Sequence, residues 1–321
     1  MELHGRGRVL AKLNAIKPKL GEVSSIFVGL QTDADDVYIL RQLKAGGGRV
    51  LCYSKATQNE HWFEDAHLKA FLKGSLNIRR YSVSDVNKRL IFPYVMVEGK
   101  STLIKPEFYA SQFPLTWSYL MVCKSILESR NKGHMGTSWY GYVYKKNHTR
   151  FELGKILVPS LATGSCFTAD FEGKYFFVGS GGGGGGGYGI VVNEQCDFSR
   201  SYLLGILNSS LVTYIIRSTS TNFRGGYYAL NRQYIEQIPI WKPDLANLSS
   251  KRSHDNITTF VDAMLALHVR LAAAKTPHEA TSLQSQIDAT DARIDAIVYE
   301  LYGLTEDEIA IVEAVTDLEK E

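Results

Sequence analysis

The feature that most limits the fold of this chain is an unbroken run of seven glycines at 181–187, inside the glycine-rich stretch 179–189. Glycine has no side chain to bury and loses the most backbone freedom on folding, so the run cannot fill a helix interior or a hydrophobic core. Aromatic and β-branched residues on both sides, at 174–178 and 190–192, predict two strands. Composition allows either a flexible linker or a loop whose backbone approaches a ligand closely. Because strands flank the run, we favour a functional loop supported by a sheet.

The overall composition is that of a globular protein with room for two or three domains. The 321 residues are 45% hydrophobic and 21% charged. No apolar run is long enough to cross a bilayer, and the first residues lack the apolar core of a signal peptide, so we expect no membrane partner. The four scattered cysteines, Cys52, Cys123, Cys166 and Cys196, form no CxxC pair, which predicts buried free thiols in a reducing cytoplasm and no metal site.

Positive charge is concentrated in the first 250 residues. Of the 36 Lys and Arg and the 33 Asp and Glu, residues 251–321 hold 6 and 14, a net charge of −8. The remaining 30 basic and 19 acidic residues give residues 1–250 a net charge of +11, and residues 71–160 alone carry 14 basic and 5 acidic residues. This distribution predicts a polyanion-binding region followed by a separate support or partner-binding module, although a chance excess of solvated lysines would give the same numbers.

The first 245 residues carry a mixture of strand and helix signals. Alternating or β-branched runs predict strands at 25–30, 37–40, 49–54, 89–94 and 155–159, and the first two are expected to pair as a hairpin with a polar tip. Apolar spacing predicts helices at 61–73, from Phe113 to about Gly133, and from Tyr202 through Ile215.

The C-terminal residues predict helices only. Apolar residues recur at helical spacing over 255–274 and again from Pro277 to the stop at Gly303, and a capping box at 305–308 opens a short third helix. We therefore expect an α/β (α+β) mixed-sheet domain at residues 1–245, followed by an α-helical hairpin domain at 246–321 that acts as a spacer or docking element.

Several common enzyme motifs are missing. The glycine run is not followed by the Lys-Ser/Thr of a phosphate loop, and its match to the dinucleotide fingerprint is one that any polyglycine would give. His134 and His148 lie in the basic region, where we expect surface or DNA-facing groups and not catalytic residues or metal ligands. A catalytic chain that uses the glycine loop as an S-adenosylmethionine or nucleotide site is the enzyme alternative.

Basic residues alternate with aromatic residues and glycine in three places: residues 79–81, 139–150 and 224–228. Arg and Lys neutralise phosphates, Arg also reads guanine edges, and aromatic rings stack on bases. The same residue types decorate exposed sheets, and a general RNA- or single-strand-binding module would share them. Together the three clusters favour nucleic-acid binding.

Several stretches follow, in order, the pattern of a known family. The resemblance is carried by Ile26–Thr32 with Val37–Leu40, Arg79–Tyr81, Ile91–Tyr94, Trp117–Leu120 with Leu127–Arg130, Trp139-Tyr140, Lys155–Pro159, Gly187–Ile190, Tyr202–Ser209 and Ile238–Ile240. The most specific stretch is Ile294–Ile309, which contains Val298-Tyr299-Glu300-Leu301-Tyr302-Gly303-Leu304-Thr305-Glu306. The chain resembles the TaqI-like C-terminal specificity domain of bacterial adenine-N6 DNA methyltransferases and of fused type II restriction-modification enzymes.

Two departures limit what the resemblance implies. The family's G-R-D-I-x-R-Y is replaced by Gly74–Tyr81, which lacks the first Arg and the Asp, and the N-P-P-[YF] motif that holds a flipped adenine is absent. The resemblance therefore implies a target-recognition region separated from its catalytic half. Its partners would be duplex DNA and a methyltransferase, with or without a nuclease, as a further domain or subunit that uses S-adenosylmethionine.

The clusters, the glycine loop and the resemblance together give a set of predicted DNA-binding residues. No catalytic residue, cofactor or metal ligand is assigned to this chain. The predicted set is Thr32, Arg79, Arg80, Tyr81, Trp139, Tyr140, Lys145, Lys146, Lys155, Gly183, Gly185, Gly187, Tyr188, Arg224 and Tyr227.

Overall fold

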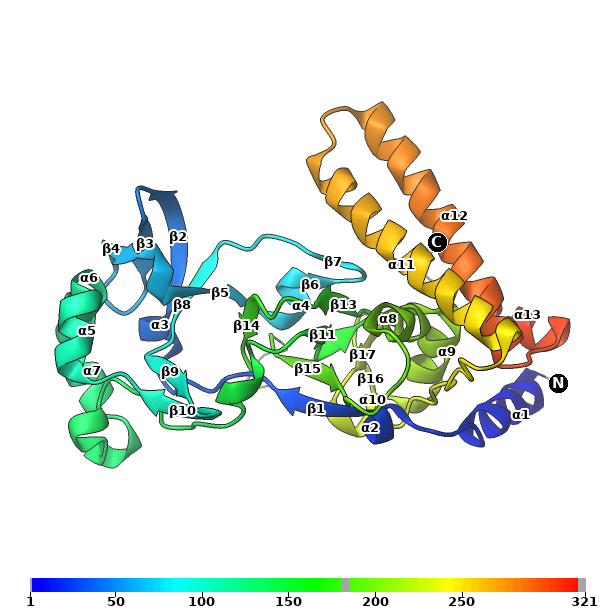
Figure 1. Cartoon of the computed structure of the whole chain (residues 1–321), viewed down its shortest axis with the longest axis horizontal. Coiled ribbons are helices and arrows are strands. Elements are labelled where there is room, and N and C mark those ends of the chain that lie inside the picture. Colours follow the sequence, from blue (N-terminus) through cyan, green and yellow to red (C-terminus); the bar gives the residue numbers. More distant parts are fainter. Residues whose placement is uncertain (1, 180–184, 317–321) are drawn as a thin grey trace.

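The computed structural model describes residues 2–179 and 185–316, which form sheets and helices around two hydrophobic cores (Figure 1). The first core takes most of its side chains from residues 27–151 and is completed by Leu157, Phe176 and Phe177. The second core is built from residues 9–26, from Tyr81 and from residues 156–315. The expected α/β fold with a helical C-terminal part is confirmed.

A six-stranded mixed sheet supports the first core. The strand order is β14-β5-β8-β2-β3-β4, and only the β14–β5 pair is parallel. Gly47 and Gly48, both with positive φ, make the tight turn between β2 and β3, as two-residue hairpins require. The strands are β2 (Ile39–Gly46), β3 (Arg49–Ser54), β4 (Asn59–Glu64), β5 (Leu68–Leu72), β8 (Lys88–Ile91) and β14 (Tyr175–Phe177).

Three helices cover the outer end of this sheet: α5 (Pro106–Gln112), α6 (Pro114–Val122) and α7 (Lys124–Glu128). The Glu64 carboxylate accepts hydrogen bonds from the backbone N–H groups of Leu115 (2.8 Å) and Thr116 (3.1 Å), which fixes the start of α6. The helical segment predicted from Phe113 is confirmed, but it ends at Glu128 and not near Gly133. Arg130 Nε donates to the Leu127 carbonyl (3.0 Å) and satisfies the end of α7.

A four-stranded antiparallel sheet supports the second core, in the order β1-β15-β11-β13. Its strands are β1 (Ser24–Val28), β11 (Lys155–Pro159), β13 (Thr168–Asp170) and β15 (Gly187–Val192). Helices α8 (Arg200–Asn208) and α9 (Ser210–Thr219) pack in the same core. The Ser199 and Ser209 hydroxyls cap these helices, so the helix predicted across 202–215 is two helices that meet at Ser209.

Two long antiparallel helices, α11 (Leu248–Ala273) and α12 (Pro277–Leu301), form the C-terminal hairpin, and α13 (Glu306–Thr316) follows. These three helices confirm the prediction. Their apolar faces lie in the same core as α8, where a Cβ built on Gly205 would be 2.5 Å from Ile257 Cγ2. The N-terminal helix α1 (Glu2–Asn14) packs on α13, and Lys12 pairs with Glu308 at 2.6 Å.

Short elements connect these parts. The helices are α2 (Leu20–Val23), α3 (Asp35–Tyr38), α4 (Gly74–Asn77) and α10 (Arg232–Ile235). The strands are β6 (Ile78–Arg79), β7 (Ser82–Val83), β9 (Tyr94–Val97), β10 (Lys100–Leu103), β12 (Leu161–Ala162), β16 (Asn222–Phe223) and β17 (Tyr227–Ala229). In the part of the chain that the structure describes, no helix combines the length and apolarity needed to cross a membrane.

The hairpin predicted between residues 25–30 and 37–40 is wrong. β1 pairs with β15, and β2 pairs with β3 and β8 in the other sheet. The second segment begins as α3, which buries Val37 and Tyr38 in the first core. Two segments that are close in sequence and both predicted as strands therefore belong to different sheets.

The helix predicted at 61–73 is also wrong. This segment forms β4, a 3-10 turn at Asp65–His67, and β5. Pairing with β3 on one side and with β8 on the other buries Phe63 and Phe71 in the first core. The 3-10 turn lies between the two strands and shifts the spacing of their apolar residues, so that it resembles the spacing of a helix. Pairing with β3 and β8 decides the structure of this segment in place of its local sequence pattern.

Both strands predicted beside the glycine run are confirmed, as β14 and β15. They belong to different sheets, so the run joins the six-stranded sheet to the four-stranded sheet. Its residues 180–184, including the predicted DNA-binding residue Gly183, lie outside the described residues.

Candidate nucleic-acid interface

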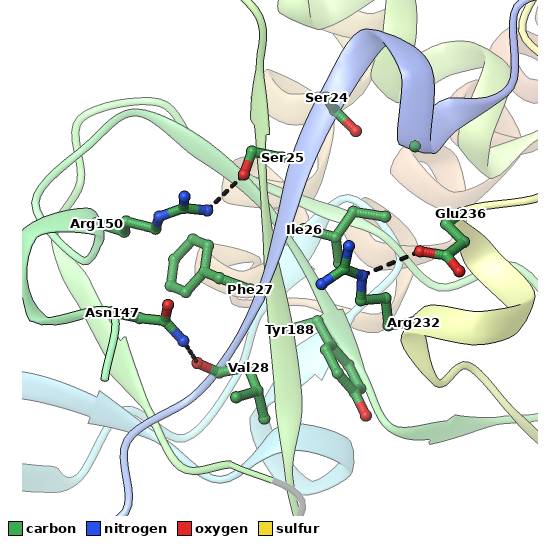
Figure 2. A pocket seen from close by; sticks show the side chains of 11 residues that line it. Ser24, Ser25, Ile26, Phe27, Val28, Asn147, Arg150, Tyr188, Arg232 and Glu236 are labelled. Atoms are coloured by element: carbon green, nitrogen blue, oxygen red, sulfur yellow. Dashed lines mark hydrogen bonds and ion pairs between the residues drawn. The ribbon is translucent and has the colours of Figure 1, made fainter. Parts of the chain in front are cut away.

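A cavity of about 540 Å³ lies along β1, the edge strand of the four-stranded sheet (Figure 2). Asn147 and Arg150, which follow the predicted residues Lys145 and Lys146, border one side of the strand. Asn147 Nδ2 donates to the Val28 carbonyl (3.1 Å), and Arg150 Nη1 donates to Ser25 Oγ (2.5 Å). These contacts hold the loop against the edge of β1 that, among the described residues, pairs with no other strand.

Arg150 keeps most of its binding capacity. Its guanidinium lies 5.9 Å from the centre of the Phe27 ring, and it forms no ion pair with a carboxylate in the described part of the chain. Only one of its five N–H groups donates to a protein atom there, and that acceptor is neutral. A half-buried guanidinium with spare donors can bind a phosphate with a forked pair of hydrogen bonds.

The other side of the cavity carries a neutralised arginine. Arg232 Nε donates to Glu236 Oε2 at 3.0 Å (Figure 2). Tyr188, a predicted DNA-binding residue, lines the same cavity, and its hydroxyl donates to Asn231 Oδ1 at 3.4 Å. Positive charge in this cavity therefore comes chiefly from the side of Arg150.

A larger cavity, of about 880 Å³, begins where β1 ends. It is lined by residues 30–37, Lys55, Ile126, Tyr144, Val178 and Gly179. The predicted residue Thr32 is buried here, and its hydroxyl donates to Asp35 Oδ1 (2.5 Å) and accepts from the Ala34 N–H (3.2 Å). Three carboxylates, those of Asp33, Asp35 and Asp36, face one lysine. Such a lining repels phosphates but offers acceptors for the amino groups of base edges.

Arg130, which was not among the predicted residues, holds the wall of this second cavity. It is only 7% exposed, and it donates to the carbonyls of Thr32 (3.0 Å), Trp139 (2.6 Å) and Gly141 (2.9 Å). It therefore ties the 30–37 segment to the aromatic segment that leads to Tyr144. The sequence carries no signal for this role, because an arginine at a helix end is usually exposed.

Glycines on neighbouring segments, and Gly187 at the end of the loop, allow backbones to approach closely around the base of the loop. A Cβ on Gly29 would be 2.3 Å from the Val178 carbonyl carbon, and a Cβ on Gly74 would be 1.9 Å from the Gly186 carbonyl oxygen. Gly187, within β15, has the Val158 oxygen 2.9 Å from its Cβ position, whereas Gly185 has no atom within 4 Å. At the base of the loop, glycine is thus required because backbone segments of the protein itself pack closely against one another.

Other predicted residues lie away from these cavities. Trp139 (7% exposed) and Tyr140 (2% exposed) are in the first core, where the Tyr140 hydroxyl donates to the Ile104 carbonyl at 2.6 Å. Lys155 is fully buried and forms an ion pair with Asp170 at 2.5 Å. In this conformation none of these three side chains can reach DNA.

Arg79, Arg80 and Tyr81 separate although they are adjacent in sequence. Arg80 forms a forked pair with Asp291 of α12 (2.6 Å to each oxygen) and donates to the Asn208 carbonyl, while Tyr81 is buried in the second core. Arg79 is exposed and donates to the Ser75 carbonyl (2.6 Å). Of the three, only Arg79 is accessible to DNA.

The remaining predicted residues are exposed. Arg224 and Tyr227 lie on the β16–β17 hairpin, where Gly225 and Gly226 make the turn. His148, expected at the surface, is buried, and burial among aromatic rings lowers its pKa to about 4. The structure thus brings Thr32, Tyr188, the base of the glycine loop and the Lys145–Lys146 segment to one surface along β1, and their contact with DNA stays a prediction.

Known proteins match this chain in a consistent way. Residues 112–240 match the family model of the TaqI-like C-terminal specificity domain. The chain is also 20% identical, over 292 residues, to the type II restriction enzyme and methyltransferase RM.Eco57I of Escherichia coli. That similarity covers 88% of this chain but only 29% of the enzyme's length. Residues 112–240 are thus the part of the chain that is similar to the TaqI-like C-terminal specificity domain.

Proposed function

We propose that this chain selects the DNA target of a type II restriction-modification system by binding duplex DNA in a sequence-specific way. The observation that carries the proposal is that residues of the matched domain line both cavities along β1. Tyr144, Asn147, Arg150, Tyr188 and Arg232 all fall within residues 112–240. The net charge of +11 in residues 1–250 supports binding of a polyanion.

The two cavities would divide the work of recognition. Arg150 and the exposed Lys145 and Lys146 would neutralise phosphates and set the register of the duplex. The carboxylates of the second cavity would accept hydrogen bonds from base amino groups in the major groove. Affinity would come mainly from the first surface, and sequence choice from the second.

The catalytic steps would belong to a methyltransferase region outside these residues. That region would bind S-adenosylmethionine and receive the flipped adenine for N6 methylation. A nuclease within the system is compatible with the name of the E. coli enzyme, which is both a restriction enzyme and a methyltransferase. We place the system in the bacterial cytoplasm, together with its DNA.

A selection of bound duplexes from a random pool at physiological salt tests this function. We expect the full chain to enrich a short motif that contains an adenine, and to prefer duplex DNA over RNA of equal length. A pool without any enriched motif would contradict sequence-specific recognition by this chain. Calorimetric titration with S-adenosylmethionine provides a second check, because clear binding to the chain itself would favour a catalytic role.

A further inference from the structure

A second group of cations lies on the six-stranded sheet, outside the matched domain. The strand register places Lys88 of β8 directly opposite Arg41 of β2, and Arg41 directly opposite Tyr53 of β3. Lys73 follows the end of β5, and Lys55 follows the end of β3. All five side chains line one small cavity. We call Arg41, Lys55, Lys73 and Lys88 the sheet cation cluster.

The cluster is unfavourable for the free protein. Like charges that face each other on neighbouring strands destabilise a sheet. Burial lowers the pKa of Lys88, and the positive charges of Lys73, Lys55 and Arg41 lower it further. In the described residues none of the four forms an ion pair with a carboxylate, although Asp35 and Asp36 line the same cavity.

The other face of the same strands shows how this sheet treats cations that serve only structure. Arg89, next to Lys88 in β8, donates to Gln42 Oε1 (2.7 Å) and lies 3.8 Å from an Asp65 oxygen. In the described residues the Arg41 guanidinium instead lies against the Tyr53 ring, whose centre is 5.3 Å from the guanidinium carbon. The four cations outnumber the two carboxylates of Asp35 and Asp36 in this cavity, and in the described residues none of the four is held in an ion pair, which indicates that an external anion completes the site.

The shape of the cluster favours an extended polyanion over a small ligand. The cavity holds about 120 Å³, whereas small-molecule sites usually hold about 300 to 1,000 Å³. Neighbouring strands are about 4.8 Å apart, so the row from β8 to β3 is about 10 Å long. Phosphates follow one another along each DNA strand at every nucleotide, so a row of this length can contact more than one phosphate of a strand.

The cluster also continues the candidate interface. Lys55 lines both this cavity and the acidic second cavity, and Lys73 precedes Gly74, which packs against the end of the glycine loop. The β2–β3 hairpin that carries Arg41 and Tyr53 projects from the sheet on the same side as the α11–α12 hairpin (Figure 1). A duplex read in the second cavity would therefore cross the cluster.

We propose that the sheet cation cluster binds the phosphate backbone of the DNA that flanks the recognised bases. This inference rests on the proposed function, and it adds a site whose role is affinity and not sequence choice. Phosphate contacts carry no direct sequence information, so loss of the cluster should weaken binding to every duplex alike.

Salt dependence of binding tests the cluster. The test variant is Arg41→Gln/Lys73→Gln/Lys88→Gln, which leaves Lys55 of the second cavity in place, and the control variant, Lys100→Gln/Lys105→Gln/Lys132→Gln, removes the same charge from exposed sites elsewhere. The slope of log K against log salt is negative, and it should become less negative by about 2.7 in the test variant, since each lost phosphate contact removes about 0.9 from its magnitude. The motif selected from the random pool should not change. A slope equal to that of the control variant would overturn the proposal.

Two further measurements keep the test decisive. The melting temperature of the test variant should equal or exceed that of the unmodified chain, because the variant removes repulsion. If the triple variant does not fold, the single substitution Lys55→Glu, at an exposed site, should still make the slope of log K against log salt less negative on a random-sequence duplex. An unchanged slope would contradict phosphate binding by the cluster. If the unmodified chain selects no motif, the proposed function fails, while the slope comparison still decides whether the cluster binds DNA.

Discussion

At the scale of single residues, charge in the sequence does not reveal where a side chain points. Lys155 and Arg80 were both expected to face DNA, but Lys155 lies in β11, which is central in its sheet and has all five residues buried. Arg79 and Arg80 are neighbours, yet one is exposed and the other forms an ion pair with α12. Residue types predicted which basic and aromatic side chains the chain has for binding DNA. Burial decides which of those side chains a ligand can reach.

The buried ion pair of Lys155 is expected to be essential for stability. Asp170 also accepts hydrogen bonds from the backbone N–H groups of Lys174 (2.8 Å) and Tyr175 (3.1 Å). Lys155→Met would leave a buried carboxylate without its cation, so the free energy of unfolding should fall by about 3 to 5 kcal/mol in urea titrations. The control is Lys174→Met, which removes an exposed ion pair with Glu172 and should leave the urea midpoint nearly unchanged. Equal effects of the two substitutions would contradict this role.

At the scale of elements, periodic segments were predictable and their partners were not. The helices at α6, α11 and α12 and the strands β3 and β11 follow from apolar spacing and β-branched content. The pairing of β1 with β15 depends on contacts between residues 24–28 and 188–192, which no local pattern contains. The sheet cation cluster escaped prediction for the same reason, since Arg41 and Lys88 meet only through the strand register.

The contact between α8 and α11 gives a prediction at this scale. A Cβ on Gly205 would be 2.5 Å from Ile257 Cγ2 and 2.9 Å from Val261 Cγ2, both in the second core. Gly205→Ala should therefore destabilise the protein by about 1 to 3 kcal/mol through overpacking. Gly7→Ala is the matched control, because Gly7 lies in α1 with nothing within 4 Å of its Cβ position and should stabilise by about 0.5 to 1 kcal/mol. Urea unfolding of both variants measures the difference in sign.

At the scale of the whole molecule, the predicted boundary at residue 245 stays a prediction. The charge and composition change there, but the second core contains side chains from both sides, such as Leu204 and Ile294. Arg80 and Asp291 add an ion pair across the same boundary. Composition reports what a segment is made of, and it cannot report whether two segments share a core.

Truncation after residue 245 tests whether residues 1–245 fold as an independent domain or need the C-terminal helices to complete their core. Removal of α11, α12 and α13 would expose the apolar faces of α8 and α9, so we expect the shortened chain to lose cooperative thermal unfolding and to bind a hydrophobic dye. A shortened chain that melts in one sharp transition near the temperature of the full chain would instead support an independent domain at 1–245. Circular dichroism against temperature distinguishes these outcomes.

The order in which the strands leave the ribosome has a consequence for folding. In the described residues β1 has one strand partner, β15, and their register joins Ser24 to Val192. At typical rates of synthesis, on the order of ten seconds or more separate the two strands. During that time Ile26 and Phe27 lie on an unpaired strand, which is the kind of segment that other chains and chaperones bind. The four-stranded sheet can therefore form only late in synthesis, after the ribosome has made the glycine run and the residues of β15.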